Sequence, residues 1–177
     1  MIHPNMCTML SFITTDAAIS KTALQKALSE DVDDTYNMIS VDGDTSTNDT
    51  VLVIANGMAE NEKIVEGTKE YEVFAEALHE INEYLAKKIA GDGRRGRLHY
   101  SKVNVVGAQT KEQAVLLSKA IACSNLTKTA IAGHDANWGR IIVCDGILRR
   151  HNLIQRKWIC FLRVRQERFR LQKMELL

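Results

Sequence analysis

The sequence lacks the features that define several special classes of protein. No apolar run approaches the roughly eighteen residues that a membrane-spanning helix requires, and the first residues lack the basic-then-apolar layout of a secretory signal peptide. The four cysteines form no C-x-x-C pair, which argues against a zinc site or a disulfide framework; they are Cys7, Cys123, Cys144 and Cys160. We therefore expect a cytoplasmic protein without a bound metal, whose thiols are buried or incidental.

A large net charge is also missing, because the formal net charge is +1. The charges are unevenly distributed, however. Residues 144–177 contain nine Lys or Arg and three acidic residues, whereas residues 1–143 contain fourteen and nineteen. A basic segment of this kind suggests binding to nucleic acid or to a membrane surface, and a basic amphipathic helix is a second interpretation.

The rest of the pattern alternates between strands and helices. The chain has 177 residues, of which 45% are hydrophobic and 25% charged, enough for one sizeable core or two small ones. Short apolar runs predict strands, and apolar residues at helical spacing predict helices. The strands are expected at 9–15, 37–41, 51–55, 103–106 and 141–143, and the helices at 20–33, 71–90 and 111–123. Without an internal repeat, this alternation indicates the α/β class.

Thr8 lies directly before the first of these strands, four residues after Pro4, the only proline. A threonine hydroxyl becomes a nucleophile when a base removes its proton, and its own α-amino group can be that base once the preceding peptide bond is cut. That amine is partly neutral near pH 8, where α-amino groups titrate. The residues alone also fit a simpler interpretation, since a threonine at the start of a strand is commonly just a β-branched strand residue.

A polar segment, Asp42–Thr50, precedes a later strand. Asp42, Asp44 and Ser46 alternate as calcium ligands do, but the glycine falls in the wrong place and no glutamate follows at the twelfth position of such a loop. A turn in which Asn, Asp, Ser and Thr side chains bond the local backbone is the favoured interpretation.

Further along, His134 and Asp135 have the residue types of a base and its orienting partner. Side chains of adjacent residues seldom hydrogen-bond to each other, so we assign no catalytic role to His134. We also assign none to His3, which lies near Thr8 in the sequence. The residues Trp138-Gly139-Arg140 that follow are interpreted as a structural turn.

Three separated segments in this order are highly specific: Met1–Asp16, Val41–Thr50 and Lys128–Arg140. Together they resemble the ornithine acetyltransferase (glutamate N-acetyltransferase) family of arginine biosynthesis. Its members are made as a precursor that cuts itself before the threonine of an N-M-A-T-M-L motif, giving an α chain and a β chain. The matching residue is Thr8, and Cys7 stands where the family usually has alanine. The resemblance thus implies autocleavage between Cys7 and Thr8.

The implied reaction is a ping-pong transfer in which Thr8 binds and carries the acetyl group of N-acetylornithine and passes it to glutamate. No cofactor is implied, and acetyl-CoA stays open as a further donor. The partner would be the α chain, which supplies the oxyanion hole and a substrate-binding lysine, in a heterotetramer. Neither nucleic acid nor a membrane is an expected partner.

The implied fold is a layered α-β-β-α sandwich with a smaller C-terminal α+β domain, which is incomplete here. The predicted division is an N-terminal-nucleophile α/β region at 1–92, the start of the smaller domain at 93–143 and an atypical basic tail at 144–177. The polar segment Asp42–Thr50 is expected to position Thr8.

Two stretches depart from the family pattern. After Gly91-Asp92-Gly93 the family continues E-G-A-T-K, with an acid that holds the substrate's amino group, whereas Arg94 stands here and would repel an ammonium group. Both stretches can be back-translated with chosen codons and read again from the third base. Residues 95–102 then give G-A-T-T-L-F-E, and residues 152–161 give F-N-P-E-K-V-D-M-F. Both peptides are close to the sequence of the family at these places. We therefore expect a shifted reading frame in these stretches. An inactive truncated fragment and an N-terminal-nucleophile amidohydrolase remain the alternatives to the transferase.

Overall fold

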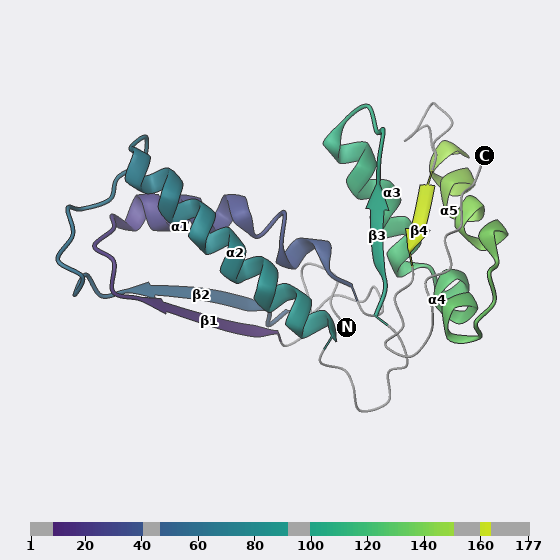
Figure 1. Cartoon of the computed structure of the whole chain (residues 1–177), viewed down its shortest axis with the longest axis horizontal. Helices are drawn as coiled ribbons and strands as arrows, with labels where there is room; N and C mark the ends of the chain where they lie inside the picture. Colours follow the sequence, from purple (N-terminus) through teal and green to yellow (C-terminus); the bar gives the residue numbers. More distant parts are fainter. Residues whose placement is uncertain (1–8, 41–46, 92–99, 151–159, 164–177) are drawn as a thin grey trace. The chain divides into compact units, whose positions relative to one another are not determined.

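The computed structural model describes residues 9–40, 47–91, 100–150 and 160–163. The chain forms two compact units, Met1–Asp92 and Gly93–Leu177, and each is described by itself (Figure 1). Helices and strands are mixed along the chain and alternate from β1 to α3, which agrees with the predicted α/β class. No helix among the described residues is long and apolar enough to cross a membrane.

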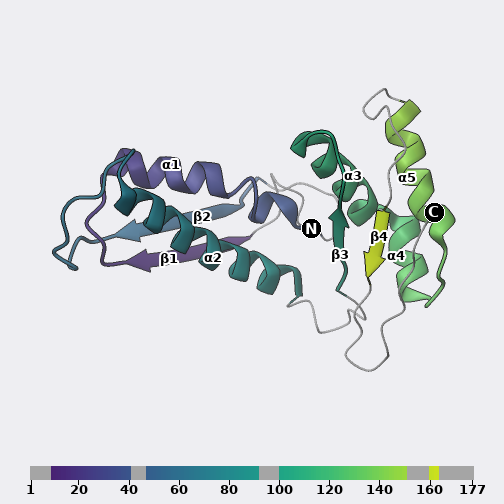
Figure 2. The ribbon, with the colours of Figure 1, turned by 45° about the horizontal axis from the view of Figure 1, so that its top comes forward.

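The first unit is built on two parallel strands, β1 (Leu10–Thr15) and β2 (Thr50–Ala55), paired in register from Leu10↔Thr50 to Thr15↔Ala55. Parallel strands require a crossover connection, and α1 (Lys21–Asp31) with the short 3₁₀ helix η1 (Tyr36–Met38) lies within it. Helix α2 (Lys69–Gly91) follows β2. Both long helices lie over the same face of the strand pair (Figure 2).

Local signals explain where the two helices begin. The hydroxyl of Ser20 accepts the backbone N–H of Ala23 at 3.2 Å, which caps α1. Thr68 does the same for Tyr71 at the start of α2, and Glu70 lies in its positively polarised first turn. Both helices were predicted from their spacing of apolar residues, and both are confirmed.

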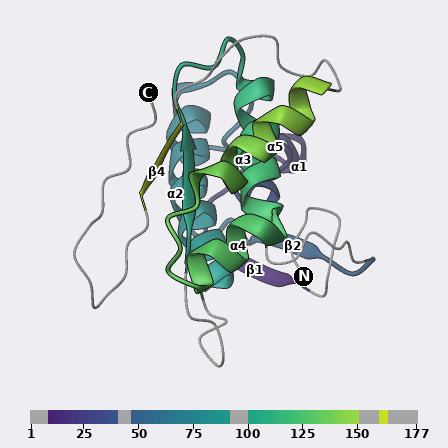
Figure 3. The ribbon, with the colours of Figure 1, turned by 90° about the vertical axis from the view of Figure 1, so that its right-hand side faces the viewer.

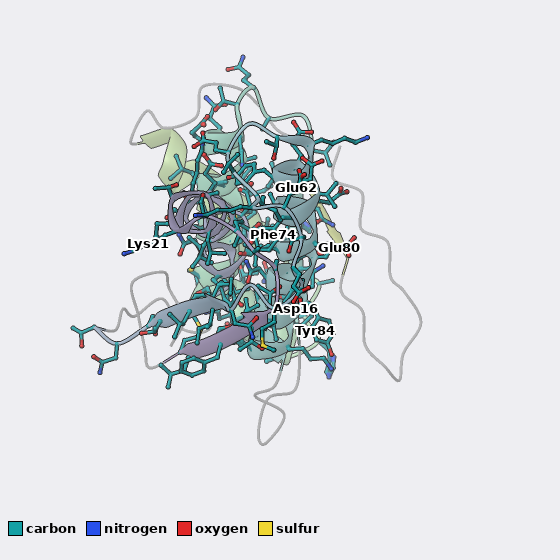
Figure 4. All side chains as sticks on the ribbon, turned by 90° about the vertical axis from the view of Figure 1, so that its left-hand side faces the viewer. Asp16, Lys21, Glu62, Phe74, Glu80 and Tyr84 are labelled. Carbon is teal, nitrogen blue, oxygen red and sulfur yellow. The ribbon has the colours of Figure 1, made fainter. Side chains whose placement is uncertain are left out.

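The core of the first unit lies between the strand pair and the helices. Ile13, on the covered face of β1, packs with Ala27 of α1 and Leu78 of α2, and Phe74 joins them (Figure 4). A second cluster, nearer the start of β1, contains Met9, Tyr36 and Ala86. Burial of these side chains fixes which face of each strand points inward.

The second unit contains β3 (Lys102–Val105) and β4 (Cys160–Arg163), which pair antiparallel. Three helices accompany them among the described residues: α3 (Lys111–Cys123), α4 (Asn125–Ala132) and α5 (Trp138–Arg150) (Figure 3). Its core consists of Leu117 and Ile121 from α3 with Ile141 and Cys144 from α5.

Two predicted strands are wrong. Residues 141–143 lie within α5, because Ile141 and Cys144, three residues apart, both turn toward α3; three apolar residues in a row cannot reveal that period. Residues 37–38 belong to η1, and no strand follows among the described residues up to 40. Helix α4 had not been predicted.

The predicted boundary between residues 143 and 144 falls inside α5, and Cys144 is 5% exposed. Arg94 and residues 164–177 lie outside the described residues. The shifted reading frame stays a prediction, which the coding DNA can test.

Candidate active site

The predicted nucleophile, Thr8, lies outside the described residues, together with Cys7 and His3. The described chain begins at Met9, whose amide nitrogen is covalently joined to the carbonyl carbon of Thr8. The surroundings of Met9 therefore define the framework to which Thr8 is attached.

The backbone of Met9 is held on both sides, by Asp49 just before β2 and by Thr50, the first residue of β2. Its N–H donates to Asp49 Oδ1 at 2.9 Å, and its carbonyl accepts the N–H of Thr50 at 2.8 Å. Its side chain is buried in the cluster with Tyr36 and Ala86. One carboxylate, one strand hydrogen bond and one core contact thus fix this residue.

The carboxylate of Asp49 is half-buried at this position. Burial raises the pKa of Asp49, while the hydrogen bond from the Met9 N–H acts in the opposite direction. The bond to Met9 is the compensation for burying this charge.

A second polar contact lies two residues into β1. Ser11 Oγ and Tyr36 Oη are 2.7 Å apart, and the two residues are 5% and 3% exposed. Burial raises the pKa of the Tyr36 hydroxyl, which the hydrogen bond with Ser11 partly opposes. This buried pair ties β1 to η1.

The parallel register explains why these groups meet. Because β1 and β2 run in the same direction and Leu10 pairs with Thr50, the residues before each strand lie at the same end of the pair. The segment ending at Asp49 therefore reaches the backbone next to Thr8. Asp42, Asp44 and Ser46 lie outside the described residues, so the contacts above do not test the calcium-loop interpretation.

The face of the strand pair opposite α1 and α2 is apolar and exposed. Phe12 and Leu52 are cross-strand partners and are 62% and 42% exposed, and Leu10 and Ile54 extend the same face. Figure 4 shows side chains projecting from both faces of the strands. Parallel strands are typically apolar on both faces because both are covered. This surface is called the open sheet face below.

The segment around His134 links α4 to α5 in the second unit. His134 adopts a φ of 54°, and the N–H of Asp135 donates to the carbonyl of Ala130 at 2.9 Å. Arg140 Nη1 donates to the carbonyl of Leu126 at 3.0 Å and to Thr129 Oγ1 at 2.7 Å. These contacts join the two helices and give the segment a structural role.

The sequence of residues 1–164 matches the model of the ArgJ family. The chain belongs to this family. The predicted resemblance is confirmed, since the matching relatives carry the name arginine biosynthesis bifunctional protein ArgJ.

The relatives are closely similar to this ArgJ chain. The protein from Caldanaerobacter subterraneus subsp. tengcongensis is 58% identical over 146 residues, and that from Thermotoga neapolitana is 56% identical over the same length. These alignments cover 82% of this chain but only 36% of each relative. The chain therefore spans about a third of the length of the curated relatives it matches.

A solved structure is also similar. The crystal structure of arginine biosynthesis bifunctional protein argJ from Bacillus halodurans superposes with a TM-score of 0.72 at 48% identity. The match covers 78% of this chain and 65% of that chain.

The sequence motifs predicted that Asp42–Thr50 positions Thr8, but they did not indicate Asp49, Ser11 or Tyr36. Asp49 lies two residues before the predicted strand 51–55, so predicting that this strand runs parallel to 9–15 would have indicated it. Tyr36 gives no such signal, because its contact with Ser11 depends on how η1 returns across the strand pair.

Proposed function

We propose that this chain is the acetyltransferase subunit of an ArgJ enzyme, moving an acetyl group from N-acetylornithine to glutamate through an acetyl-Thr8 intermediate. The observation that carries the proposal is the doubly held Met9 backbone beside Thr8, in a chain of the ArgJ family. A nucleophile gains rate when its attachment is rigid, because orientation is then fixed before the reaction.

The reaction has two balanced halves. Thr8 Oγ attacks the acetyl carbonyl carbon of N-acetylornithine, the amide C–N bond breaks, and the hydroxyl proton leaves on the amino group of ornithine. The amino group of glutamate then attacks the acetyl ester. The ester C–O bond breaks, and Thr8 Oγ recovers a proton from that amine. The free α-amino group of Thr8 relays the proton in both halves, which requires the Cys7–Thr8 bond to be cut.

The partner in this proposal is an α chain, and the open sheet face is its docking surface. Adding a second apolar sheet there gives the α-β-β-α layering, because two sheets pack face to face about 10 Å apart. Burying each large apolar side chain of this face contributes about 1.5–3 kcal/mol.

The coverage values support two separate chains in the family. A similar length of this chain covers 36% of the curated relatives but 65% of the solved Bacillus halodurans chain. That solved chain is therefore about half as long as the curated relatives, as expected if the precursor is divided.

The test is co-expression of the full chain with the α chain of the Caldanaerobacter relative, followed by intact mass measurement and an acetyl-transfer assay. The wild type is expected to lose Met1–Cys7 and to transfer acetyl groups to glutamate. Thr8→Ala should lose both properties. Cys7→Ala is the matched control, since it changes only the other side of the cut bond. Transfer that survives Thr8→Ala, or its absence from the wild-type pair, would overturn the proposal.

A further inference from the structure

We propose that Asp49 is a positioning residue for Thr8, acting through the peptide group that joins Thr8 to Met9. The inference rests on the proposed function, since it requires Thr8 to be the nucleophile. It assigns a role to one side chain of the polar segment and states how that side chain acts.

The geometry gives the mechanism. The N–H of Met9 belongs to the Thr8–Met9 peptide group, and a peptide group is planar, with the α-carbons of both residues in that plane. Asp49 Oδ1 holds this N–H at 2.9 Å, and the hydrogen bond spans 40 residues of sequence. Restraining the N–H therefore restrains the plane to which the α-carbon of Thr8 is attached.

The strand hydrogen bond cannot replace this restraint. Thr50 N–H binds the carbonyl of Met9, which belongs to the next peptide group along the chain. That bond lies on the other side of the Met9 α-carbon, so it does not act on the N–H of Met9. Asp49 is the described contact that acts on the Thr8 side of this α-carbon.

The site is also built for a carboxylate. Hydrogen bonds from a backbone N–H to a carboxylate are stronger than those to a neutral acceptor, by roughly a factor of two. Asp49 is half-buried, and burying a carboxylate costs free energy. The hydrogen bond from the Met9 N–H opposes this cost. A residue needed only to make a turn could lie fully exposed.

Asn61 offers a matched control within the same unit. Its Oδ1 accepts the N–H of Ala18 at 2.8 Å across 43 residues, the same kind of contact made beyond the other end of β1. Asn61→Ala removes a comparable restraint far along the chain from Thr8.

The experiment measures acetyl transfer and backbone exchange for Asp49→Ala, Asp49→Asn and Asn61→Ala, each co-expressed with the α chain described above. Asp49→Ala should lower kcat by about 10²-fold with KM little changed, because misorientation by about 1 Å costs that much. Asp49→Asn keeps an acceptor oxygen and should recover most of kcat, and Asn61→Ala should match the wild type. In the full chain alone, hydrogen exchange of the Met9 amide should accelerate in Asp49→Ala, while that of the Thr50 amide should not.

The outcomes separate the two proposals. If Thr8→Ala abolishes transfer but Asp49→Ala behaves like Asn61→Ala, the positioning role is wrong and the proposed function stands. Positioning by this hydrogen bond would also be overturned if Asp49→Ala and Asp49→Asn lowered kcat equally while the hydrogen exchange of the Met9 amide stayed unchanged. If the wild-type pair transfers nothing, the proposed function fails, and the role of Asp49 fails with it.

Discussion

Replacing Tyr36 with phenylalanine removes the hydroxyl that pairs with Ser11 and leaves the rest of the ring in the core. Tyr36 and Ser11 are 3% and 5% exposed, so water cannot readily replace the lost partner. Leaving one buried hydroxyl unpaired costs about 1–3 kcal/mol of unfolding free energy. Ser11→Ala should lower the free energy of unfolding by a similar amount, because it leaves the Tyr36 hydroxyl buried without its partner.

The double variant provides the sharper measurement. With both hydroxyls removed, nothing is left unpaired, so the two losses should not add, and the coupling free energy should be at least about 1 kcal/mol. Urea unfolding of the full chain, followed by circular dichroism, gives all four free energies. Strictly additive losses, or a Tyr36→Phe variant as stable as the wild type, would refute the buried hydrogen bond.

The same residue predicts a pH dependence. Because burial raises the pKa of Tyr36 in the folded chain, its stabilising contribution is fully present below the ordinary tyrosine pKa of about 10. It is lost as the pH rises through the raised folded pKa. The alkaline decline in stability should therefore be smaller in Tyr36→Phe, and an unchanged decline would contradict the assignment.

Two further predictions concern surfaces. Phe12→Thr and Ile54→Thr, on the open sheet face, should leave the unfolding free energy of the chain alone within about 0.5 kcal/mol but prevent co-purification with the α chain. Val73→Thr on α2, which is 59% exposed, is the control and should co-purify normally. In the second unit, Arg140→Ala should destabilise the chain by about 1 kcal/mol, because Leu126 and Thr129 lose a charged donor. This would be contradicted if Thr129→Val lowered the free energy of unfolding, measured in the same urea titration, by more than Arg140→Ala does.

The sequence predicted elements well where a pattern was long. Helix α2 presents several turns of apolar spacing, and Ser20 marks the start of α1 by capping. The short runs failed, because three apolar residues such as 141–143 fit a strand and a helix equally well. What decided between them was packing of Ile141 against α3, which lies outside the run itself.

The contacts beside the candidate site could not be predicted from the sequence, and the role of Thr8 stays a prediction. The family motifs indicated Thr8, which lies outside the described residues, and the segment before β2, whose Asp49 contacts the backbone of Met9 because the two strands are parallel. The contact between Asp49 and Met9 depends on the register of these strands, which a single sequence does not reveal. The Ser11 and Tyr36 pair depends further on the path of η1 back over the strands.

The central claim is that Thr8 carries the acetyl group. The most direct measurement is peptide mass spectrometry of the chain co-expressed with the α chain and quenched during reaction with N-acetylornithine in the absence of glutamate. We predict one added acetyl group on the peptide that begins with Thr8, and its loss when glutamate is supplied. An acetyl group on another residue, or none while transfer continues, would contradict the account.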